Sequence, residues 1–412
     1  MAEVLRPINP NPGSERDQRN FVGRADTTRR AEQMLRAGQN ILISDPRRMG
    51  KTFWMQTIAT RPEFKGNYRV LFIDYQGVNS TEEFLTKTAA ELAGSSSLPQ
   101  KFHSRLKAVF DGVDTSVSLF GIQLKAAVRK SAKGPAEIME ELLIHLDNDL
   151  SEDVAALPVV IAMDEVPDAV MEIARCGAAG EAHNLLKRLR HLRGTTKKIR
   201  WIVAGSIGFH HVLTAAGAST DVLNNLDPLE FGPLAQADAV ELAQRLALGI
   251  QRPISAEAVA RVVEMTDAIP SLVQKLFDMM QYDQNRQSAA GSQINAGEVA
   301  ERLEDFINDR DKSRDVTHFV TRVDLYYGQD VALAWQILDY MAGAADWTPF
   351  TSLEESMTTA LGSEFDRKRF VTTYNNLCDD HYLAEREADG QSEVAWRYPV
   401  IRTIYRRRQK LG

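Results

Sequence analysis

The chain has 412 residues, a formal net charge of −7 and an ordinary apolar content of 44%. This length allows more than one core, so two or three domains are expected, and the composition excludes a fibrous or disordered protein. The acidic balance excludes a surface that coats nucleic acid indiscriminately, although it leaves room for a local basic patch. Two cysteines, Cys176 and Cys378, are too few for a disulfide framework and favour a reducing compartment.

The first 20 residues predict an extended arm rather than a helix or strand. Pro7, Pro10, Pro12 and Gly13 interrupt any regular element there. The arm has no apolar signal region, and no later run is long enough to span a bilayer. We therefore expect a cytoplasmic protein that does not enter a membrane.

From residue 21 to about 228, apolar strands alternate with helical segments, which is typical of a parallel α/β sheet sandwiched by helices. Strands are expected at 40–44, 68–76, 157–165 and 198–206. The stretch near 115–130 breaks this pattern, because apolar residues alternate on both sides of Gly121. It predicts a β-hairpin inserted into the sheet domain.

The segment "SDPRRMGKT", between the first strand and the helix after it, has the Gly, Lys and Thr of a phosphate-binding loop in order. Such a loop presents backbone N–H groups and a helix N-terminus to phosphate, while its lysine reaches the β- and γ-phosphates. Gly50 supplies the conformation that lacks a Cβ, Lys51 the charge, and Thr52 the hydroxyl for Mg²⁺. The strand before the loop and the helix after it are the context that this chemistry requires.

Asp45 occupies the position where the usual loop has its first glycine. That position lies at the entrance of the loop, far from the β- and γ-phosphates. Aspartate tolerates unusual backbone angles, and we expect Arg47 and Arg48 to offset its charge. On this interpretation Asp45→Gly changes ATP affinity only a few-fold.

The other half of a nucleotide site is expected at the end of the third strand, in "VVIAMDEVPD". Asp164 is placed to hold Mg²⁺ through water, and Glu165 to orient and polarise the attacking water. A full strand lies between the loop and these acids in the sequence, and Glu165 directly follows Asp164. This arrangement is typical of ATPases with an additional central strand and a catalytic glutamate.

Two further polar groups are expected near the γ-phosphate. Ser206 ends the fourth strand and fits the role of a sensor. Phosphoryl transfer also needs extra positive charge, and Arg193 is favoured over Arg188 and Arg190 because it ends the helix before that strand.

After residue 228 the strand signal weakens. Successive helices predict a small helical lid domain over 229–293, followed by a linker helix and a winged-helix-like domain over 294–412. Three helices are expected there, at 330–344, 351–361 and 367–387, with a β-wing after them. The segment 397–412 has six Arg or Lys and no acid.

The order of "FVGR" at 21–24, "PRRMGKT" at 46–52, "MDEVP" at 163–167 and "AGSIG" at 204–208 resembles the AAA+/STAND P-loop ATPases, especially their archaeal-ATPase-like group. "TDAIPSLVQKL" is similar to the helical-lid motif of this family, although Ala268 replaces its usual glycine. The C-terminal segments "DHYLAE" and "WRYPVIRTIYRRR" look like its winged helix, so the resemblance covers nearly the whole chain.

The resemblance implies ATP or ADP with Mg²⁺ at the junction of sheet and lid. It assigns Thr52 and Asp164 to the metal, Glu165 to the water and Ser206 to the γ-phosphate. The residues that it implies for the nucleotide itself are Val22, Gly23 and Arg24 at the adenine, Arg48, Met49, Gly50, Lys51, Thr52 and Phe53 around the phosphates, and Pro270 on the base and ribose side.

Three functions remain open. The first is a slow, Mg²⁺-dependent ATPase that acts as a molecular switch and couples nucleotide state to a protein partner or to homo-oligomerisation. The second is an ATP-dependent DNA-binding protein that uses its winged helix and basic C-terminal tail. The third is a regulatory or adaptor protein of a prokaryotic antiviral defence system, because the sequence shows no effector constellation of its own.

Overall fold

The computed structural model describes residues 5–12, 15, 17–109, 131–281, 291–309, 311, 313, 321–344 and 346–411. Its internal contacts divide the chain into two units. The sheet unit consists of Ala25–Ser44 and Lys51–Phe231, and the helical unit of Met1–Arg24, Asp45–Gly50 and Gly232–Gly412. The β-hairpin expected near 115–130 lies outside the described residues.

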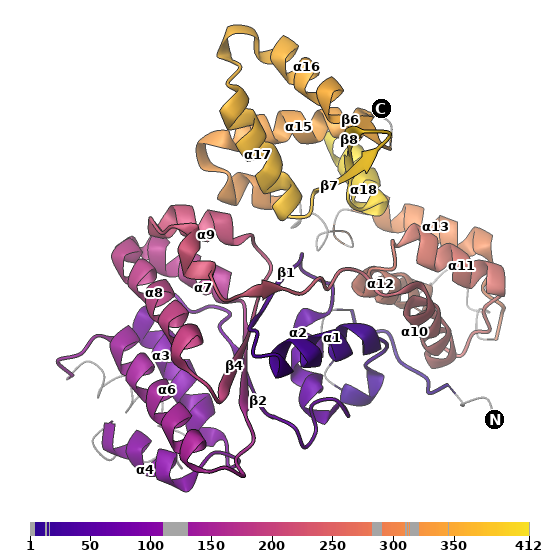
Figure 1. The fold of residues 1–412 in the computed structure, drawn as a ribbon. Coiled ribbons are helices and arrows are strands. Elements are labelled where there is room, and N and C mark those ends of the chain that lie inside the picture. Colours follow the sequence, from indigo (N-terminus) through magenta and orange to yellow (C-terminus); the bar gives the residue numbers. More distant parts are fainter. Residues whose placement is uncertain are drawn as a thin grey trace. The chain divides into compact units, whose positions relative to one another are not determined.

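Five parallel strands in the order β2-β3-β4-β1-β5 form the core of the sheet unit (Figure 1). They are β1 (Ile41–Ser44), β2 (Arg69–Asp74), β3 (Val159–Asp164), β4 (Ile199–Gly205) and β5 (Asp227–Pro228). Every residue of β3 is buried, as expected for a parallel strand covered on both faces. The parallel α/β sheet predicted from the sequence is confirmed.

The strand that separates β1 from β3 in space is β4, which pairs with both. Strand β2, which lies between the loop and the acid pair in the sequence, is at the edge of the sheet. The additional central strand is thus present, but the chain supplies it after the acids. Crossovers through helices let parallel strands take places that differ from their sequence order.

Helices cover both faces of this sheet, with α1 and α2 on one face and α3, α6 and α8 on the other (Figure 1). Ser80 begins α3 by accepting a hydrogen bond from the backbone N–H of Glu83, as the capping pattern predicts. The described α-helices of the unit are α1 (Ala25–Arg36), α2 (Lys51–Thr57), α3 (Thr81–Gly94), α4 (Gln100–Val109), α6 (Pro135–Glu152), α7 (Val166–Ile173), α8 (Ala179–Thr195) and α9 (Phe209–Ala216).

Between residues 232 and 309, the described α-helices of the helical unit are α10 (Gln236–Gly249), α11 (Ala256–Met265), α12 (Pro270–Gln281) and α13 (Ala296–Asn308). A second group follows, with α15 (Val331–Gly343), β6 (Thr348–Pro349), α16 (Phe350–Leu361), α17 (Arg367–Asp379), β7 (Leu383–Ala388), β8 (Gln391–Trp396) and α18 (Pro399–Gln409). Strands β6, β8 and β7 form an antiparallel sheet in that order. Three helices with a β-hairpin after them have the element order of a winged helix.

The third C-terminal helix is shorter than the sequence predicts. It ends at Asp379, a turn follows at residues 380–382, and the residues from Leu383 to 387 that were expected to continue the helix belong to β7. Asp389 and Gly390 both have positive φ, so they make a tight turn that folds β8 back onto β7. Pairing across this turn overrides the helical pattern of the preceding residues.

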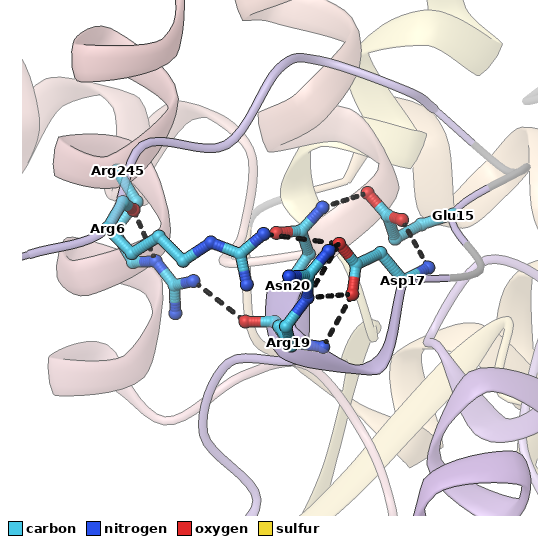
Figure 2. A network of polar contacts seen from close by, with 6 residues as sticks. All are labelled: Arg6, Glu15, Asp17, Arg19, Asn20 and Arg245. Atoms are coloured by element: carbon cyan, nitrogen blue, oxygen red, sulfur yellow. Dashed lines mark hydrogen bonds and ion pairs between the residues drawn. The ribbon is translucent and has the colours of Figure 1, made fainter.

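Arg6, Ile8 and Arg19, among the described residues of the N-terminal arm, contact α10 (Figure 2). The buried Arg245 guanidinium donates to the carbonyl oxygens of Arg6 and Arg19, at 2.9 and 3.0 Å. Ile8 is also buried, and its N–H donates to the carbonyl of Arg245. A Cβ on Gly249 would lie 1.9 Å from the Ile8 carbonyl oxygen, so this close approach requires glycine.

Candidate active site

The carboxyl ends of β1, β3 and β4 lie at one edge of the sheet, because these neighbouring strands are parallel. Helix α2 begins at Lys51, with six residues between it and the end of β1, Asp164 ends β3, and Ser206 follows β4. The sheet therefore brings together at this edge three segments that are far apart in the sequence. Ligands of open α/β sheets bind at such an edge.

Thr52 and Asp164 meet in the structure. The Thr52 hydroxyl donates to Oδ2 of Asp164 at 2.5 Å, while Oδ1 accepts from the backbone N–H of Glu165 at 3.0 Å. Asp164 is buried, and burial raises its pKa to about 6, against the hydrogen bond from Thr52, which lowers it. Lys51 beside it is also buried.

A hydroxyl oxygen and a carboxylate oxygen in contact form a donor pair that suits Mg²⁺, which prefers hard oxygen ligands and takes one or two carboxylates from protein. The residues present therefore fit the metal. Thr52 and Asp164 would hold it, and its charge would neutralise phosphate oxygens.

Glu165 and Ser206 also meet, and a third polar residue joins them. The Ser206 hydroxyl lies 3.0 Å from Oε2 and 3.3 Å from Oε1 of Glu165, and 3.2 Å from Oδ2 of Asp168. Glu165 has φ 55°, in the left-handed region that a non-glycine residue seldom adopts. Such strain is a feature of functional sites, where the surrounding structure maintains it.

A close approach between Gly205 and Pro167 fixes the spacing of this cluster. A Cβ on Gly205 would lie 2.3 Å from Cγ and 2.4 Å from Cδ of Pro167. Only glycine lets the end of β4 contact the first turn of α7 at this distance. Since Ser206 follows Gly205, and Pro167 stands between Glu165 and Asp168, the contact sets the distances from the hydroxyl to both carboxylates.

In the helical unit, Arg24 holds three backbone segments. Its buried guanidinium donates to the carbonyl oxygens of Met49, Gly232 and Pro233, at 2.9, 2.7 and 2.9 Å. Burial lowers the pKa of Arg24 to about 10, partly offset by Asp45 and other acidic groups. Through these bonds the guanidinium connects the loop at Met49 to the backbone of Gly232 and Pro233.

The two residues before Arg24, Val22 and Gly23, are also expected from the sequence to contact the nucleotide. Val22 is buried. Gly23 has φ 72°, and a Cβ there would overlap the side chain of Asp238, which accepts the N–H of Arg24 at 3.1 Å. Near the end of the loop, a Cβ on Gly50 would lie 3.9 Å from Cγ of Pro270, so these two residues of the helical unit are neighbours.

Asp45 is buried, and its carboxylate accepts the backbone N–H of Gly232 at 3.1 Å. The acid at the loop entrance thus bonds to the backbone of Gly232, and Arg24 is a cation near it. The sequence suggests Arg47 and Arg48 for that role. Both are exposed, and Arg48 has φ 77°.

The remaining expected site residues take different places. Met49 is buried and Phe53 half-buried on either side of the glycine and lysine. Arg193 is buried and donates to the carbonyl of Val222, and burial lowers its pKa to about 10. This contact anchors the end of α8 and leaves its proposed catalytic role without support from a described contact.

Sequence reasoning missed Asp168, Asp238 and Gly205. Asp168 was visible as the last acid of "MDEVPD", four residues after Asp164, which on a helix start faces back toward the strand end. Asp238 offered no local signal, because its partners are more than 200 residues away in the chain.

No family model matches the chain, and no curated protein matches it. Among solved structures, a Walker-type ATPase of Pyrococcus abyssi matches with 14% identity over 98% of this chain and 99% of that chain, with a TM-score of 0.56. The chain has the fold of a Walker-type ATPase. This fold agrees with the P-loop resemblance of the sequence and extends it across the described residues.

Two further likenesses to the Walker-type ATPase fold of this chain are weaker. The ORC2 protein of Aeropyrum pernix, solved with ADPNP and ADP, is 10% identical over 97% of this chain and 96% of that chain, with a TM-score of 0.47. The RuvB Holliday junction branch migration motor of Thermotoga maritima is 13% identical over 95% and 96%, with a TM-score of 0.41. Within the described residues, no helix is both long and apolar enough to cross a bilayer.

Proposed function

We propose that this protein binds ATP with Mg²⁺ and hydrolyses it slowly, acting as a molecular switch. The observation that carries the proposal is the contact between the Thr52 hydroxyl and the buried Asp164 carboxylate, beside Lys51 and Glu165. Hydroxyl, carboxylate, lysine and a second acid are the groups that phosphoryl transfer to water needs.

Each residue has a distinct proposed task. Lys51 binds the β- and γ-phosphates, Thr52 and Asp164 hold the cation, and Glu165 accepts a proton from the attacking water. Ser206 donates to the γ-phosphate. We keep Val22, Gly23, Arg24, Arg48, Met49, Gly50, Phe53 and Pro270 as proposed nucleotide contacts.

The proposal is tested with two variants that separate binding from chemistry. Lys51→Ala should abolish binding of a fluorescent ATP analogue, whereas Glu165→Gln should retain binding and lose phosphate release by at least a hundredfold. Lys65→Ala and Glu172→Gln are matched controls, because both residues are on the surface of the sheet unit and outside this cluster. Hydrolysis at the unmodified rate in either site variant would refute the proposal.

We further propose that the output of the switch is contact with a protein partner or with a second copy of the chain, as in a regulatory or defence system. The contacts of α18 support a protein role over a DNA role. Arg402 donates to Asp346 at 2.6 Å and to backbone carbonyls, Arg407 pairs with Glu304, and Arg408 donates to the hydroxyl of Ser313. These arginines stabilise the helical unit.

The acidic residues of the hairpin β7–β8, which would be the wing, also disfavour binding to the phosphates of DNA. The hairpin's exposed residues include Glu385, Glu387 and Asp389, and Arg386 is paired with Glu393. Titration of labelled duplex DNA at 50 and 200 mM salt decides between the roles. Tight binding that weakens steeply with salt would favour the DNA alternative. Mass measurement with ADP, with ATP and with Glu165→Gln tests whether ATP drives assembly.

A further inference from the structure

One face of α10 contacts the N-terminal arm along most of the helix. Asp238, Glu241, Arg245 and Gly249 follow one another at spacings of three or four residues, so they lie on the same side of α10. Asp238, Arg245 and Gly249 contact the arm, while Glu241 pairs with Arg245 at 3.1 Å. These four residues and the arm belong to the same unit of the structure.

The Arg245 guanidinium binds the arm at two places at once. Its Nε donates to the carbonyl oxygen of Arg6 at 2.9 Å, and its Nη2 donates to the carbonyl oxygen of Arg19 at 3.0 Å (Figure 2). The third nitrogen, Nη1, donates to the carboxylate of Glu241, which orients the group. Because Arg245 is buried, water competes weakly for these bonds.

Arg245 and Asp238 bind the arm on both sides of Val22. Arg19 lies in a short 3-10 helix, η1 (Gln18–Asn20), just before the residues proposed to border the adenine, which are 22–24. At the end of this segment, the Asp238 carboxylate accepts the backbone N–H of Arg24 at 3.1 Å. The segment is therefore held to α10 by one bond before it and one bond at its last residue.

A binding segment that is already ordered raises affinity. When only a fraction of the molecules has the competent conformation, the apparent dissociation constant rises by the inverse of that fraction. Residues 22–24 are proposed to contact the base, whereas the phosphates are assigned to Gly50, Lys51 and Thr52. Loss of the bonds from α10 should thus weaken the contacts with the base and spare those with the phosphates.

We propose that Arg245 and Asp238 are positioning residues that hold residues 22–24 in place for the adenine of ATP. The role rests on the proposed ATPase function and acts through the backbone of the arm. Neither side chain needs to contact the nucleotide.

The test compares ligands with and without a base, using the full chain. Arg245→Met and Asp238→Ala should each raise KM for ATP about tenfold, as expected if about a tenth of the molecules keep the segment in place. KM reports binding here because the proposed hydrolysis is slow, and kcat should stay within about twofold. The inhibition constant of tripolyphosphate, which has no base, should also stay within about twofold.

A conservative variant separates the hydrogen bond from the charge. Asp238→Asn keeps an oxygen that can accept the N–H of Arg24, so its KM should stay within about twofold of that of the unmodified chain. Arg261→Met is the matched control for Arg245→Met, because Arg261 lies on the neighbouring helix α11 and pairs with Glu264. It should leave KM unchanged.

Melting temperatures identify any variant that does not fold, and if Arg245→Met is one, the two Asp238 variants carry the test. An unchanged KM in Asp238→Ala would overturn the positioning role and leave the ATPase proposal standing. A rise in the tripolyphosphate inhibition constant as large as the rise in KM would do the same, since the base would then not be what the bonds serve. Absence of ATP turnover in the unmodified chain would refute the ATPase proposal, and the positioning role with it.

Discussion

Gly205→Ala should disturb both stability and catalysis, because it places a methyl group inside a rigid contact. The added carbon would lie 2.3 and 2.4 Å from Cγ and Cδ of Pro167. Unstrained carbon atoms approach to about 3.5 to 4.0 Å, so the two backbones must separate by roughly 1 Å. The proline ring cannot rotate away, and Pro167 is buried.

The size of the effect follows from this displacement. Overpacking of this kind costs about 1–3 kcal/mol. For a unit of about 200 residues, each kcal/mol lowers the melting temperature by about 2–4 °C, so we expect a fall of roughly 2–12 °C. The hydroxyl of Ser206, 3.0 Å from Glu165, moves with the strand end and loses that hydrogen bond.

The substitution should affect the catalytic rate more strongly than the stability of the fold. A misplacement of about 1 Å in a catalytic group can cost about a hundredfold in rate, so kcat should drop at least tenfold. Nucleotide affinity should change little, because Lys51 and Thr52 lie on another segment. Thermal unfolding, steady-state phosphate release and binding of a fluorescent ATP analogue measure the three quantities.

Gly180→Ala is the control. It lies in α8, where an added Cβ meets no atom within 4 Å, so the substitution should be neutral or stabilise by up to about 1 kcal/mol. If Gly205→Ala melted and turned over like the unmodified chain, the contact with Pro167 could not be what fixes the cluster.

Three further predictions concern the helical unit. Burial raises the pKa of Asp267 from 3.8 to about 6, although the hydrogen bond from the N–H of Val400 lowers it. The folded state therefore binds this proton more tightly than the unfolded state, and the stability of the protein falls as pH rises from about 4 to 6. The free energy of unfolding of Asp267→Asn, relative to that of the unmodified chain, should therefore rise by on the order of 1 kcal/mol from pH 4 to pH 7. Urea unfolding at the two pH values measures it. If the difference between the two proteins is the same at both pH values, the proposed effect of Asp267 is contradicted. Gly249→Ala should displace the arm around Ile8 and speed its limited proteolysis, and equal cleavage rates would argue against the fastening. Asp45→Ala should cost about 1–3 kcal/mol by leaving a buried amide unpaired, Asp45→Asn less, and both should keep ATP affinity within a few-fold; a large gain in affinity would show instead that the acid opposes phosphate.

The sequence predicts those parts of the site that depend on residues close together in the chain. A buried parallel strand is a short apolar run, so the ends of β1, β3 and β4 could be located within a residue or two, and with them Asp164 and Ser206. The phosphate loop is likewise contiguous. The sequence predicts a longer α17 than the structure has, because the conformation of the residues after Asp379 depends on a turn and a partner strand further along the chain.

Contacts between distant segments could not be predicted in this way. One partner of Asp45 is the backbone of Gly232, 187 residues later, and Arg24 is a cation near it. No periodicity or motif links these positions. The same holds for Gly205 and Pro167, whose residue types make sense only once β4 and α7 are in contact.

Asp45 belongs to a motif that the sequence shows, but its role depends on a contact with a distant segment. A glycine at the loop entrance would provide only backbone freedom, whereas the aspartate provides an acceptor for a buried N–H that needs one. Arg24 supplies donors to carbonyl oxygens on both sides of the same connection, at Met49 and Gly232. One acidic and one basic side chain, each bonded to backbone, thus connect the loop to Gly232 and Pro233. The aspartate that replaces the usual glycine of the loop is therefore explained by the backbone contact that it makes with Gly232.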